Sequence, residues 1–553
     1  MKDAAADSGC DLETDPGMDR RISEDAGPES LDLLLLHTPK FKNFYRPIGE
    51  FSFILYPPIG LLGLAHFLTQ RGHPTRTVHL GVEKYLRGSL DFDRILDENR
   101  TPLVGIDLHW HFQAWDAIET AREIKRRRPN VAIVLGGFTA SLFADEILHD
   151  FPSVDFVIRG DGEIPLLDLI RALKGNQDYR PVANLSWRDG SVIVHNPMDY
   201  AADDAMLEEI SFTDFSLMKD AKCFIESFSR FVRTEGQSER LQRLMFAKSR
   251  AYPVFVGRGC PHECSYCGGS REAHALICGR KRAAVRSAHA IVSSIRDLDR
   301  LGFDCAGLNH DVFPPATADE TYVRVFDKIA ALNLAINLEV ERYFLPTERF
   351  VESFSRLPGK DSYITLSPNS HSEEIRKSNG LYRYSNAEFE ECLEITDRYG
   401  VNVLVFYACG LPFETRKDLD EMAEYQRRLR KRFKRVRIRT GMIEIEPGSP
   451  MSRLPEKYGI EPERRSFADY YRYHSEPGNS HFLALGYSRE GCPEFGPLSS
   501  YYCSHFCGRF GAGWRAPVLC KTFAALRGAG ALRIVDWAVN LRKAERESAP
   551  AKT

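Results

Sequence analysis

The chain has 553 residues, of which 43% are apolar and 27% are charged, and its formal net charge at pH 7 is -3. This composition is that of a globular protein with two or three domains, and so small a net charge argues against a dedicated nucleic-acid-binding protein. No apolar stretch approaches the roughly 20 residues that a membrane-spanning helix needs. Thirteen cysteines are spread along the chain without a secretory signal, so we expect a cytoplasmic protein without a disulfide framework.

The first part of the chain alternates apolar strands with amphipathic helices. Residues 1–30 are polar and acidic, and we expect them to form a disordered tail. Because such alternation is typical of a parallel sheet covered on both faces, residues 31–177 are predicted to form a doubly wound, Rossmann-like α/β domain, with its ligand crevice at the carboxyl ends of the strands. The predicted strands are 31–36, 103–106 and 131–135, and the predicted helices are 59–71 and 115–128.

Residues 178–250 are predicted to link this domain to the rest of the chain. A small hairpin is expected over residues 182–194, because Asp189-Gly190 is a favourable pair for a tight turn. Residues 235–248 are charged and are interpreted as a surface helix. Nothing in the linker indicates a catalytic role.

Three cysteines, Cys260, Cys264 and Cys267, follow a short apolar strand on a loop that has glycines on both sides. The spacing CxxxCxxC supplies three thiolates, where a closed structural metal site needs four ligands, so one metal position stays open for chemistry. A zinc knuckle is the competing interpretation. It would need a fourth ligand nearby, and Cys278 and His262 are available.

Strands and helices alternate again from this loop to about residue 450. Counting the strand before the cysteines, residues 251–455 give six β/α units, which predict a partial (β/α)6 barrel with its reactive groups at the carboxyl ends of the strands. One later strand is predicted to end at 307–313. The others are predicted at 336–340, 363–367, 401–407 and 443–450.

For the last part of the chain the sequence leaves more than one interpretation open. Residues 427–439 are strongly basic and are interpreted as a solvated helix end that runs into a strand, with an acidic substrate, an anionic lipid surface or RNA as alternatives. Residues 456–553 are expected to form a C-terminal cap over the substrate region. A second metal site there stays open, because its cysteines follow no known spacing: Cys492, Cys503, Cys507 and Cys520.

The cysteine motif, with Tyr266 directly before the last cysteine, resembles that of the radical S-adenosylmethionine (radical SAM) superfamily. The resemblance implies that the three cysteines hold a [4Fe-4S] cluster and that S-adenosyl-L-methionine binds the fourth iron. It also implies contacts to S-adenosyl-L-methionine from the cysteine loop and from the ends of the fourth and fifth strands: Tyr266, Gly268, Gly269, Ser367, Asn369, Gly410 and Pro412. The family often has Glu-Ser-Gly at the fourth strand, where this chain has Ser-Pro-Asn.

Residues 56–65, 136–140 and 157–163 resemble the N-terminal cobalamin-binding domain of B12-dependent radical SAM enzymes. The first strand is not followed by the Asp-x-His-x-x-Gly motif of cobalamin mutases, so we expect no histidine ligand to cobalt. His109 and His111 are interpreted as ordinary polar or packing residues. The resemblance implies cobalamin contacts at Gly136, Gly137, Phe138, Thr139, Ala140, Gly160 and Gly162, where glycines admit a large ligand and Thr139 offers a hydroxyl.

Together these resemblances imply a methyltransferase that acts on an unactivated carbon through a 5'-deoxyadenosyl radical and methylcobalamin. The alternatives are a non-methylating rearrangement or cyclisation enzyme and, in another class, a cobalamin-binding sensor with a vestigial barrel. The expected partners are a small-molecule, lipid or peptide substrate and an electron donor of the flavodoxin or ferredoxin type. Glu339 and Glu341 should share one face of a regular strand, where either could bind the amino group of S-adenosyl-L-methionine, act as a base or form a buried salt bridge.

Overall fold

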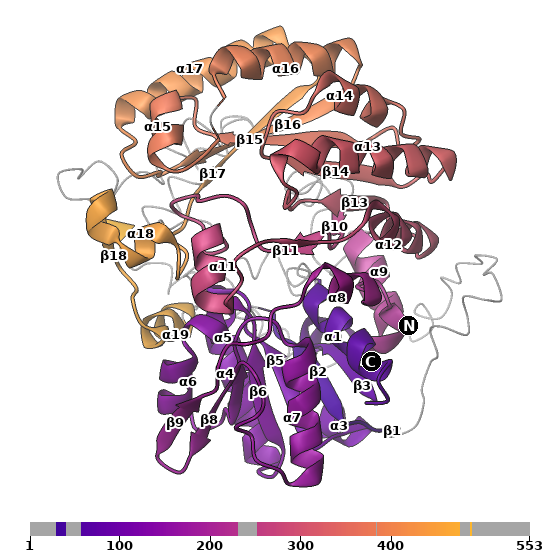
Figure 1. Cartoon of the computed structure of the whole chain (residues 1–553), viewed down its shortest axis with the longest axis vertical. Helices are drawn as coiled ribbons and strands as arrows, with labels where there is room; N and C mark the ends of the chain where they lie inside the picture. The colour runs from indigo at the N-terminus through magenta and orange to yellow at the C-terminus, as the bar shows by residue number, and fades with distance from the viewer. Residues whose placement is uncertain (1–28, 40–56, 230–250, 383, 476–486, 489–553) are drawn as a thin grey trace, which may run out of the picture.

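The structure is a computed structural model that describes residues 29–39, 57–229, 251–382, 384–475 and 487–488. Within these residues, two α/β units lie one above the other in Figure 1, the first drawn in indigo and purple and the second in magenta to orange. The predicted surface helix at 235–248, most of the predicted tail and the four C-terminal cysteines lie outside the described residues. No described helix is long and apolar enough to cross a membrane.

The first unit is built on a seven-stranded sheet with the order β3-β2-β5-β6-β7-β8-β9. Its first five strands are parallel, and the earliest of them, β2, lies between the second and the third, which is the strand order of a doubly wound domain. The predicted fold class is therefore confirmed, although β3 and β7 were not predicted. These strands are β2 (Leu33–His37), β3 (Thr75–His79), β5 (Leu103–Asp107), β6 (Ala132–Gly136) and β7 (Phe156–Ile158).

Helices cover both faces of this sheet, which explains why β2 is apolar at consecutive positions. Leu34 and Leu36 join a core with α4 on one face, whereas Leu33 and Leu35 join a core with α1 and α7 on the other. The helices of this unit are α1 (Ile59–Thr69), α2 (Leu80–Arg87), α3 (Phe92–Glu98), α4 (Ala114–Arg127), α5 (Phe138–Leu142), α6 (Ala144–Asp150) and α7 (Glu163–Gly175).

The predicted hairpin forms, with its turn at Asp189-Gly190, but it belongs to the sheet. Its strands are β8 (Leu185–Asp189) and β9 (Val192–His195), and β8 pairs antiparallel with β7. The sheet thus extends beyond residue 177, where a linker was expected to begin. Two-residue strands β1 (Glu29–Ser30) and β4 (Asn99–Arg100) form a further parallel pair, so the last two residues of the expected tail are ordered.

The second unit is a six-stranded, wholly parallel sheet with the order β10-β13-β14-β15-β16-β17, and its helices lie on the outside. Since β10 and β17 do not pair, the barrel is partial, as predicted. The strands are β10 (Ala251–Pro253), β13 (Cys305–Leu308), β14 (Asn337–Arg342), β15 (Tyr363–Asn369), β16 (Asn402–Cys409) and β17 (Val436–Met442). The helices are α12 (Ala288–Arg300), α13 (Pro315–Ala331), α14 (Glu348–Ser355), α15 (Glu373–Ser378), α16 (Asn386–Arg398) and α17 (Arg416–Arg432).

The sixth strand lies earlier than predicted, at β17 rather than at 443–450. The basic segment 427–439 is the end of α17 followed by most of β17, as interpreted, and Arg437 and Arg439 are exposed. An edge strand accepts exposed charged side chains at alternate positions, and this hid the strand from a search for apolar runs. The apolar residues Ile443 and Ile445 follow the strand and are buried.

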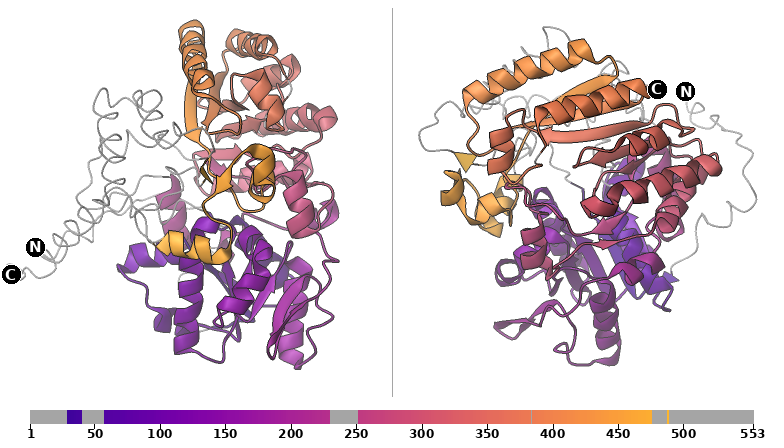
Figure 2. Two further views of the ribbon diagram at one scale, coloured as in Figure 1. Left: turned by 90° about the vertical axis from the view of Figure 1, so that its left-hand side faces the viewer. Right: turned by 45° about the horizontal axis from the view of Figure 1, so that its top comes forward.

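Shorter elements join the two units. Between them lie β11 (Gly257–Arg258), α11 (Arg271–Cys278) and β12 (Ala284–Val285), preceded by α8 (Asp204–Glu209) and α9 (Ala221–Ser229). After the barrel come α18 (Pro450–Arg453), β18 (Glu461–Pro462), α19 (Phe467–Ser475) and β19 (Tyr487–Ser488). Within the described part of the expected C-terminal cap, α19 lies against the first unit rather than over the barrel (Figure 2).

Candidate active site

The three cysteines lie on the loop between β11 and α11, beyond the carboxyl end of β10, and their thiols are free. Burial raises the pKa of Cys260 to about 11 and that of Cys264 to about 12, and it raises the pKa of Cys267 well above its usual value. Buried thiolates of this kind form only when a bound cation compensates their charge. The donor set of three cysteines therefore fits an iron–sulfur cluster.

A zinc knuckle would need a fourth ligand beside the three cysteines, and the two candidates, Cys278 and His262, pack against other parts of the chain. Cys278 lies against the first unit, since a Cβ atom added to Gly160 would be 3.1 Å from the Cα of Cys278. The ring of His262 packs instead against Tyr343 and Tyr382, with ring centroids 5.2 and 5.1 Å away.

Asn379, which the sequence did not single out, fastens the cysteine loop to the barrel. The hydroxyl of Ser265 donates to Asn379 Oδ1 at 2.6 Å, and the backbone N–H of Ser265 donates to the Asn379 carbonyl at 2.9 Å. Asn379 Nδ2 in turn donates to the carbonyl of Pro412 at 2.9 Å. The loop is thereby held beside the turn after β16, where Gly410 and Pro412 were predicted to contact S-adenosyl-L-methionine.

Gly268 and Glu446 meet at a close backbone approach. The N–H of Gly268 donates to Glu446 Oε2 at 2.6 Å, and burial raises the pKa of that carboxyl group. A Cβ atom on Gly268 would lie only 2.8 Å from the carbonyl oxygen of Pro447, so glycine is required there. For Gly269 the nearest atom, Cys267 Sγ, would be at an ordinary 3.7 Å.

Glu339 and Glu341 share one face of β14, because the strand's burial alternates regularly. Ser367 donates its hydroxyl hydrogen to Glu341 Oε1 at 2.7 Å, and burial raises the pKa of Glu341 to about 7. Among the described residues neither glutamate forms an ion pair, so the salt-bridge interpretation is not supported. Asn369 has φ +61° and donates from Nδ2 to the Ser367 carbonyl, and Gly410, at φ +90°, donates its N–H to Glu414.

Tyr266 lies between the cysteines and the two buried carboxyl groups. Burial raises its pKa far above the usual value, and the nearby Cys264, Cys267, Glu446 and Glu341 raise it further. Its side chain is nevertheless partly accessible. The structure thus gathers the cysteine loop and two acidic side chains around one site.

At the first unit, the glycines after β6 have different surroundings. Gly136 faces open space, since a Cβ atom there would meet nothing within 4 Å. Gly137 has φ +111° and packs against the preceding loop, where a Cβ atom would be 2.7 Å from the Cα of His109. The Thr139 hydroxyl donates to the His109 carbonyl at 2.9 Å, and the Ala140 N–H donates to Leu108, so the expected free hydroxyl is already engaged.

Aromatic side chains gather at the carboxyl ends of β5 and β6. The ring of Phe138 contacts His274 of α11 at a centroid distance of 4.7 Å and His109 at 5.7 Å. His109 is accessible, yet desolvation by the surrounding protein lowers its pKa, and Trp110 beside it is 44% exposed. An accessible aromatic wall at the carboxyl ends of the strands fits a large planar ligand such as cobalamin. His111 is buried against His474, in a packing role.

His37 and Asp107 form a buried pair that the sequence did not reveal. They end β2 and β5, the neighbouring strands at which the chain changes direction across the sheet, and His37 Nδ1 lies 2.6 Å from Asp107 Oδ2. The Thr38 N–H donates to the other carboxylate oxygen at 2.9 Å. The signal that might have found them is that parallel strands place their carboxyl ends side by side.

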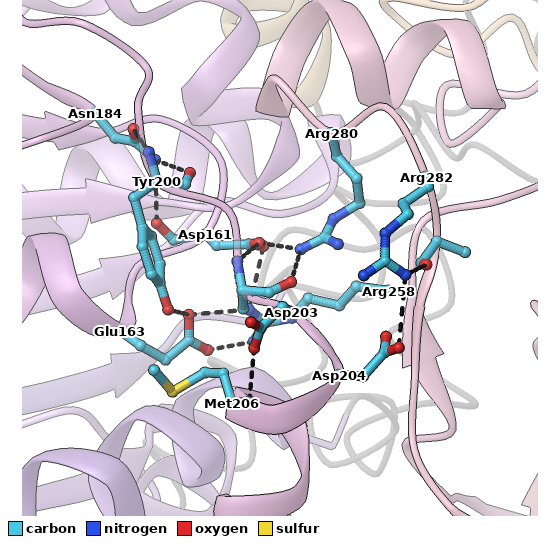
Figure 3. A network of polar contacts seen from close by, with 12 residues as sticks. Asp161, Glu163, Asn184, Tyr200, Asp203, Asp204, Met206, Arg258, Arg280 and Arg282 are labelled. Atoms are coloured by element: carbon cyan, nitrogen blue, oxygen red, sulfur yellow. Dashed lines mark hydrogen bonds and ion pairs between the residues drawn. The ribbon is translucent and has the colours of Figure 1, made fainter.

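Asp161, which lies between Gly160 and Gly162, and the nearby Glu163 pair with arginines that flank the cysteine loop (Figure 3). Arg258, two residues before Cys260, donates to both carboxylate oxygens of Glu163, at 3.0 and 2.5 Å, and lies 3.1 Å from Asp161. Arg280 also pairs with Asp161, and the Glu163 side chain is fully buried. This ion cluster fixes the start of the cysteine loop over the first unit. The cobalamin contacts expected of Gly160 and Gly162 stay predictions.

Two protein-family models match the chain. The B12 binding domain model matches residues 53–170, and the Radical SAM superfamily model matches residues 254–425. Together the two matches cover just over half of the chain, in the order in which the two α/β units occur.

Similar proteins include enzymes of two kinds. An uncharacterized methyltransferase from Pyrococcus horikoshii is 20% identical over 406 residues, which are 72% of this chain and 78% of that protein. An anaerobic magnesium-protoporphyrin IX monomethyl ester cyclase from Synechocystis is 26% identical over 216 residues, which are 38% of each chain. Among solved structures, the radical S-adenosylmethionine methyltransferase TsrM from Kitasatospora setae has the same fold, with a TM-score of 0.58 and 16% identity over 85% of this chain and 87% of TsrM.

Proposed function

The chain belongs to the cobalamin-dependent radical SAM enzymes, and we propose that it is a methyltransferase that acts on an unactivated carbon. Its cofactors supply the chemistry, since a [4Fe-4S] cluster provides the electron that cleaves S-adenosyl-L-methionine to a 5'-deoxyadenosyl radical and cobalamin carries the methyl group. One observation carries the proposal: the ion pair between Arg258 and Glu163 holds the cysteine loop over the carboxyl ends of the first sheet. In this proposal the two cofactor sites would face each other across this ion pair.

The protein's own task is to position these groups and to exclude water. Cys260, Cys264 and Cys267 would hold the cluster, and Gly136, which faces open space, would admit the corrin ring beside Phe138. Glu341, inside the barrel, is suited to bind the ammonium group of S-adenosyl-L-methionine, because the Ser367 hydroxyl stabilises its charged form. The other proposed contacts to this nucleotide are Tyr266, Gly268, Gly269, Asn369, Gly410 and Pro412.

A non-methylating cyclisation or rearrangement is the second candidate, and it is favoured by the similarity to the cyclase. That similarity covers 38% of each chain, whereas the similarity to the methyltransferase from Pyrococcus horikoshii covers 72% and 78%. We therefore rank methyl transfer first. A cobalamin sensor is disfavoured, because a sensor would need neither six complete barrel strands nor three cysteines at the end of the first.

The substrate is proposed to be a small molecule, a lipid or a peptide, and the electron donor a flavodoxin or ferredoxin. We place the protein in the cytoplasm. This location is supported by the eight cysteines of the described residues, which are all free, and by the need for reduced thiolates at the cluster.

Anaerobic reconstitution with iron, sulfide and cobalamin tests this function. Mass spectrometry should detect both 5'-deoxyadenosine and S-adenosylhomocysteine, whereas deoxyadenosine alone would favour the cyclisation reading. Cys264→Ala should lose deoxyadenosine formation and still bind cobalamin, because the substitution does not touch the cobalamin site in the first unit. Cys392→Ala, which removes a buried cysteine of α16, is the matched control and should keep both products. Deoxyadenosine at the normal level in Cys264→Ala would contradict the assignment.

A further inference from the structure

A surface depression of about 930 Å³ reaches the cysteine loop from outside. One of its walls is formed by Gly259, Cys260 and Pro261, and another by residues 312–314, which follow β13. A second depression, of about 750 Å³, adjoins it along α11 and shares Arg271 and Lys281 with it. We call this double surface the α11 face. A proposed ligand residue of the cluster therefore borders an open surface, rather than lying only inside the barrel.

Cations outnumber anions on the α11 face. The walls of the two depressions hold eight Lys or Arg residues and four Asp or Glu residues. Four of the arginines are paired with carboxylates: Arg271, Arg280, Arg282 and Arg324. Within the described residues Lys281, Lys377 and Lys457 are exposed and make no ion pair. These three exposed lysines favour an acidic partner.

Apolar side chains are exposed on the same face. Leu454 lines the second depression and is 45% exposed. Phe413 is also exposed, and it packs against Tyr458 of the second depression with ring centroids 6.1 Å apart. Exposed apolar residues within a charged rim are typical of the surface that one protein offers to another. A small anionic ligand would not need so broad a surface.

We propose that an acidic one-electron carrier protein, a flavodoxin or a ferredoxin, docks on the α11 face. This inference rests on the proposed function, which requires an electron from outside. One electron leaves the reduced flavin or iron–sulfur centre of the carrier and enters the cluster held by Cys260. The carrier is oxidised by one electron and the cluster is reduced by one, and no bond is made or broken in this step. The strongly basic segment 427–439 is a second cationic stretch, but it lies on α17 and β17, and none of its residues lines either depression.

Charge-reversal variants can show which of the two cationic surfaces, the α11 face or the segment 427–439, binds the carrier protein. The variant Lys281→Glu/Lys377→Glu changes two unpaired cations of the α11 face, and Lys431→Glu/Lys434→Glu makes the same change in the basic segment. Binding of an acidic flavodoxin to the reconstituted protein is measured by calorimetry at low and high salt. The first variant should bind about tenfold more weakly, with a smaller salt dependence, while the second binds as the parent protein does.

Deoxyadenosine formation is then compared with two reductants. In Lys281→Glu/Lys377→Glu it should fall about tenfold with reduced flavodoxin and stay unchanged with dithionite, which needs no docking surface. Equal flavodoxin binding by both variants, or weaker binding only in the control pair, would overturn the proposal. So would an equal loss with dithionite, because the face would then bind nucleotide or substrate. If the parent protein forms no deoxyadenosine even with dithionite, the proposed function is wrong. The calorimetric binding measurement then still tests whether flavodoxin docks on the α11 face.

Discussion

Glu341 lies inside the barrel, and burial raises its pKa from 4.5 to about 7. Below pH 7 the group is therefore mostly neutral, and above it the group carries the charge that an ammonium group needs. We predict that S-adenosyl-L-methionine binds the reconstituted protein more tightly at pH 8 than at pH 6, by about tenfold. In Glu341→Gln the affinity should be low and independent of pH. Equilibrium dialysis at several pH values measures this, and an unchanged pH profile in the variant would exclude Glu341 from this role.

The raised pKa of Glu341 also affects the stability of the fold, which should fall with rising pH, whereas the affinity for S-adenosyl-L-methionine should rise. Between pH 4.5 and about 7 the folded chain keeps a proton on Glu341 that the unfolded chain has lost, so the free energy of unfolding contributed by this group falls as the pH rises through that window. Denaturation of Glu341→Gln without cofactors should therefore show a smaller loss of stability between pH 5 and pH 8 than the parent chain does.

Gly268 offers a steric test with a built-in control. A methyl group there would collide with the backbone at Pro447 and separate the loop from Glu446, so Gly268→Ala should reduce cluster assembly at least several-fold. Gly269→Ala adds the same methyl group where contacts are ordinary, and it should assemble normally. Iron content and visible absorbance report the cluster. If both variants behaved alike, the close approach at Gly268 would not matter for assembly.

The single residues that could be predicted from the sequence are those whose signal is local. Cys260, Cys264 and Cys267 are set by their spacing along one loop, so a single motif specifies all three. The Thr139 hydroxyl was expected to face a ligand, but it donates to the His109 carbonyl. Glu163 was not predicted, because its partner Arg258 is 95 residues away and nothing in either neighbourhood specifies the pairing.

At the scale of elements, the pairing of β11 with α7 through Arg258 and Glu163 joins the two units. Removal of one partner from a buried ion pair leaves the other charge uncompensated, so Glu163→Gln should lower the free energy of unfolding by about 3 kcal/mol. Asp168→Asn, which breaks an exposed pair with Arg171 on the same helix, should cost less than about 1 kcal/mol.

A second readout separates positioning from stability. With the start of the cysteine loop released, Glu163→Gln should still form deoxyadenosine, but with less S-adenosylhomocysteine per deoxyadenosine than the parent protein. An unchanged product ratio together with unchanged unfolding would show that the ion cluster does not hold the two units in register.

Strands that are buried on both faces of a sheet could be predicted from the sequence, whereas edge strands and very short strands were missed or misplaced. The strand β2 is buried on both faces and is therefore continuously apolar, so its position was clear from the sequence. The edge strand β17 carries exposed arginines and was placed seven residues too late, while the short strand β7 gave no pattern long enough to detect. The antiparallel β8–β9 hairpin was predicted from its turn, but its attachment to the sheet depends on contacts with β7 that no local signal encodes.

At the scale of the whole molecule, the chain leaves the barrel and returns to the unit with which it began. The helix α19 follows the last barrel strand, yet Phe467 and Tyr470 are buried in the core of the first unit with Phe143 and Phe151. The sequence could not predict this, because an aromatic stretch such as 467–475 fits a cap over the barrel equally well. The first unit is therefore completed by residues that come more than 300 positions after its own sheet begins.

This return of the chain makes the stability of the cobalamin-binding unit depend on α19. Phe467 is fully buried, and its loss should cost about 3–5 kcal/mol, so Phe467→Ala should weaken cobalamin binding and lower the midpoint of the unfolding transition that cobalamin absorbance follows. The cysteine loop makes no described contact with Phe467, so cluster absorbance should stay normal. Arg472→Ala, which removes an exposed side chain of the same helix, should change neither measurement. If Phe467→Ala left cobalamin binding intact and disturbed the cluster instead, α19 would be acting on the barrel, as the sequence alone suggested.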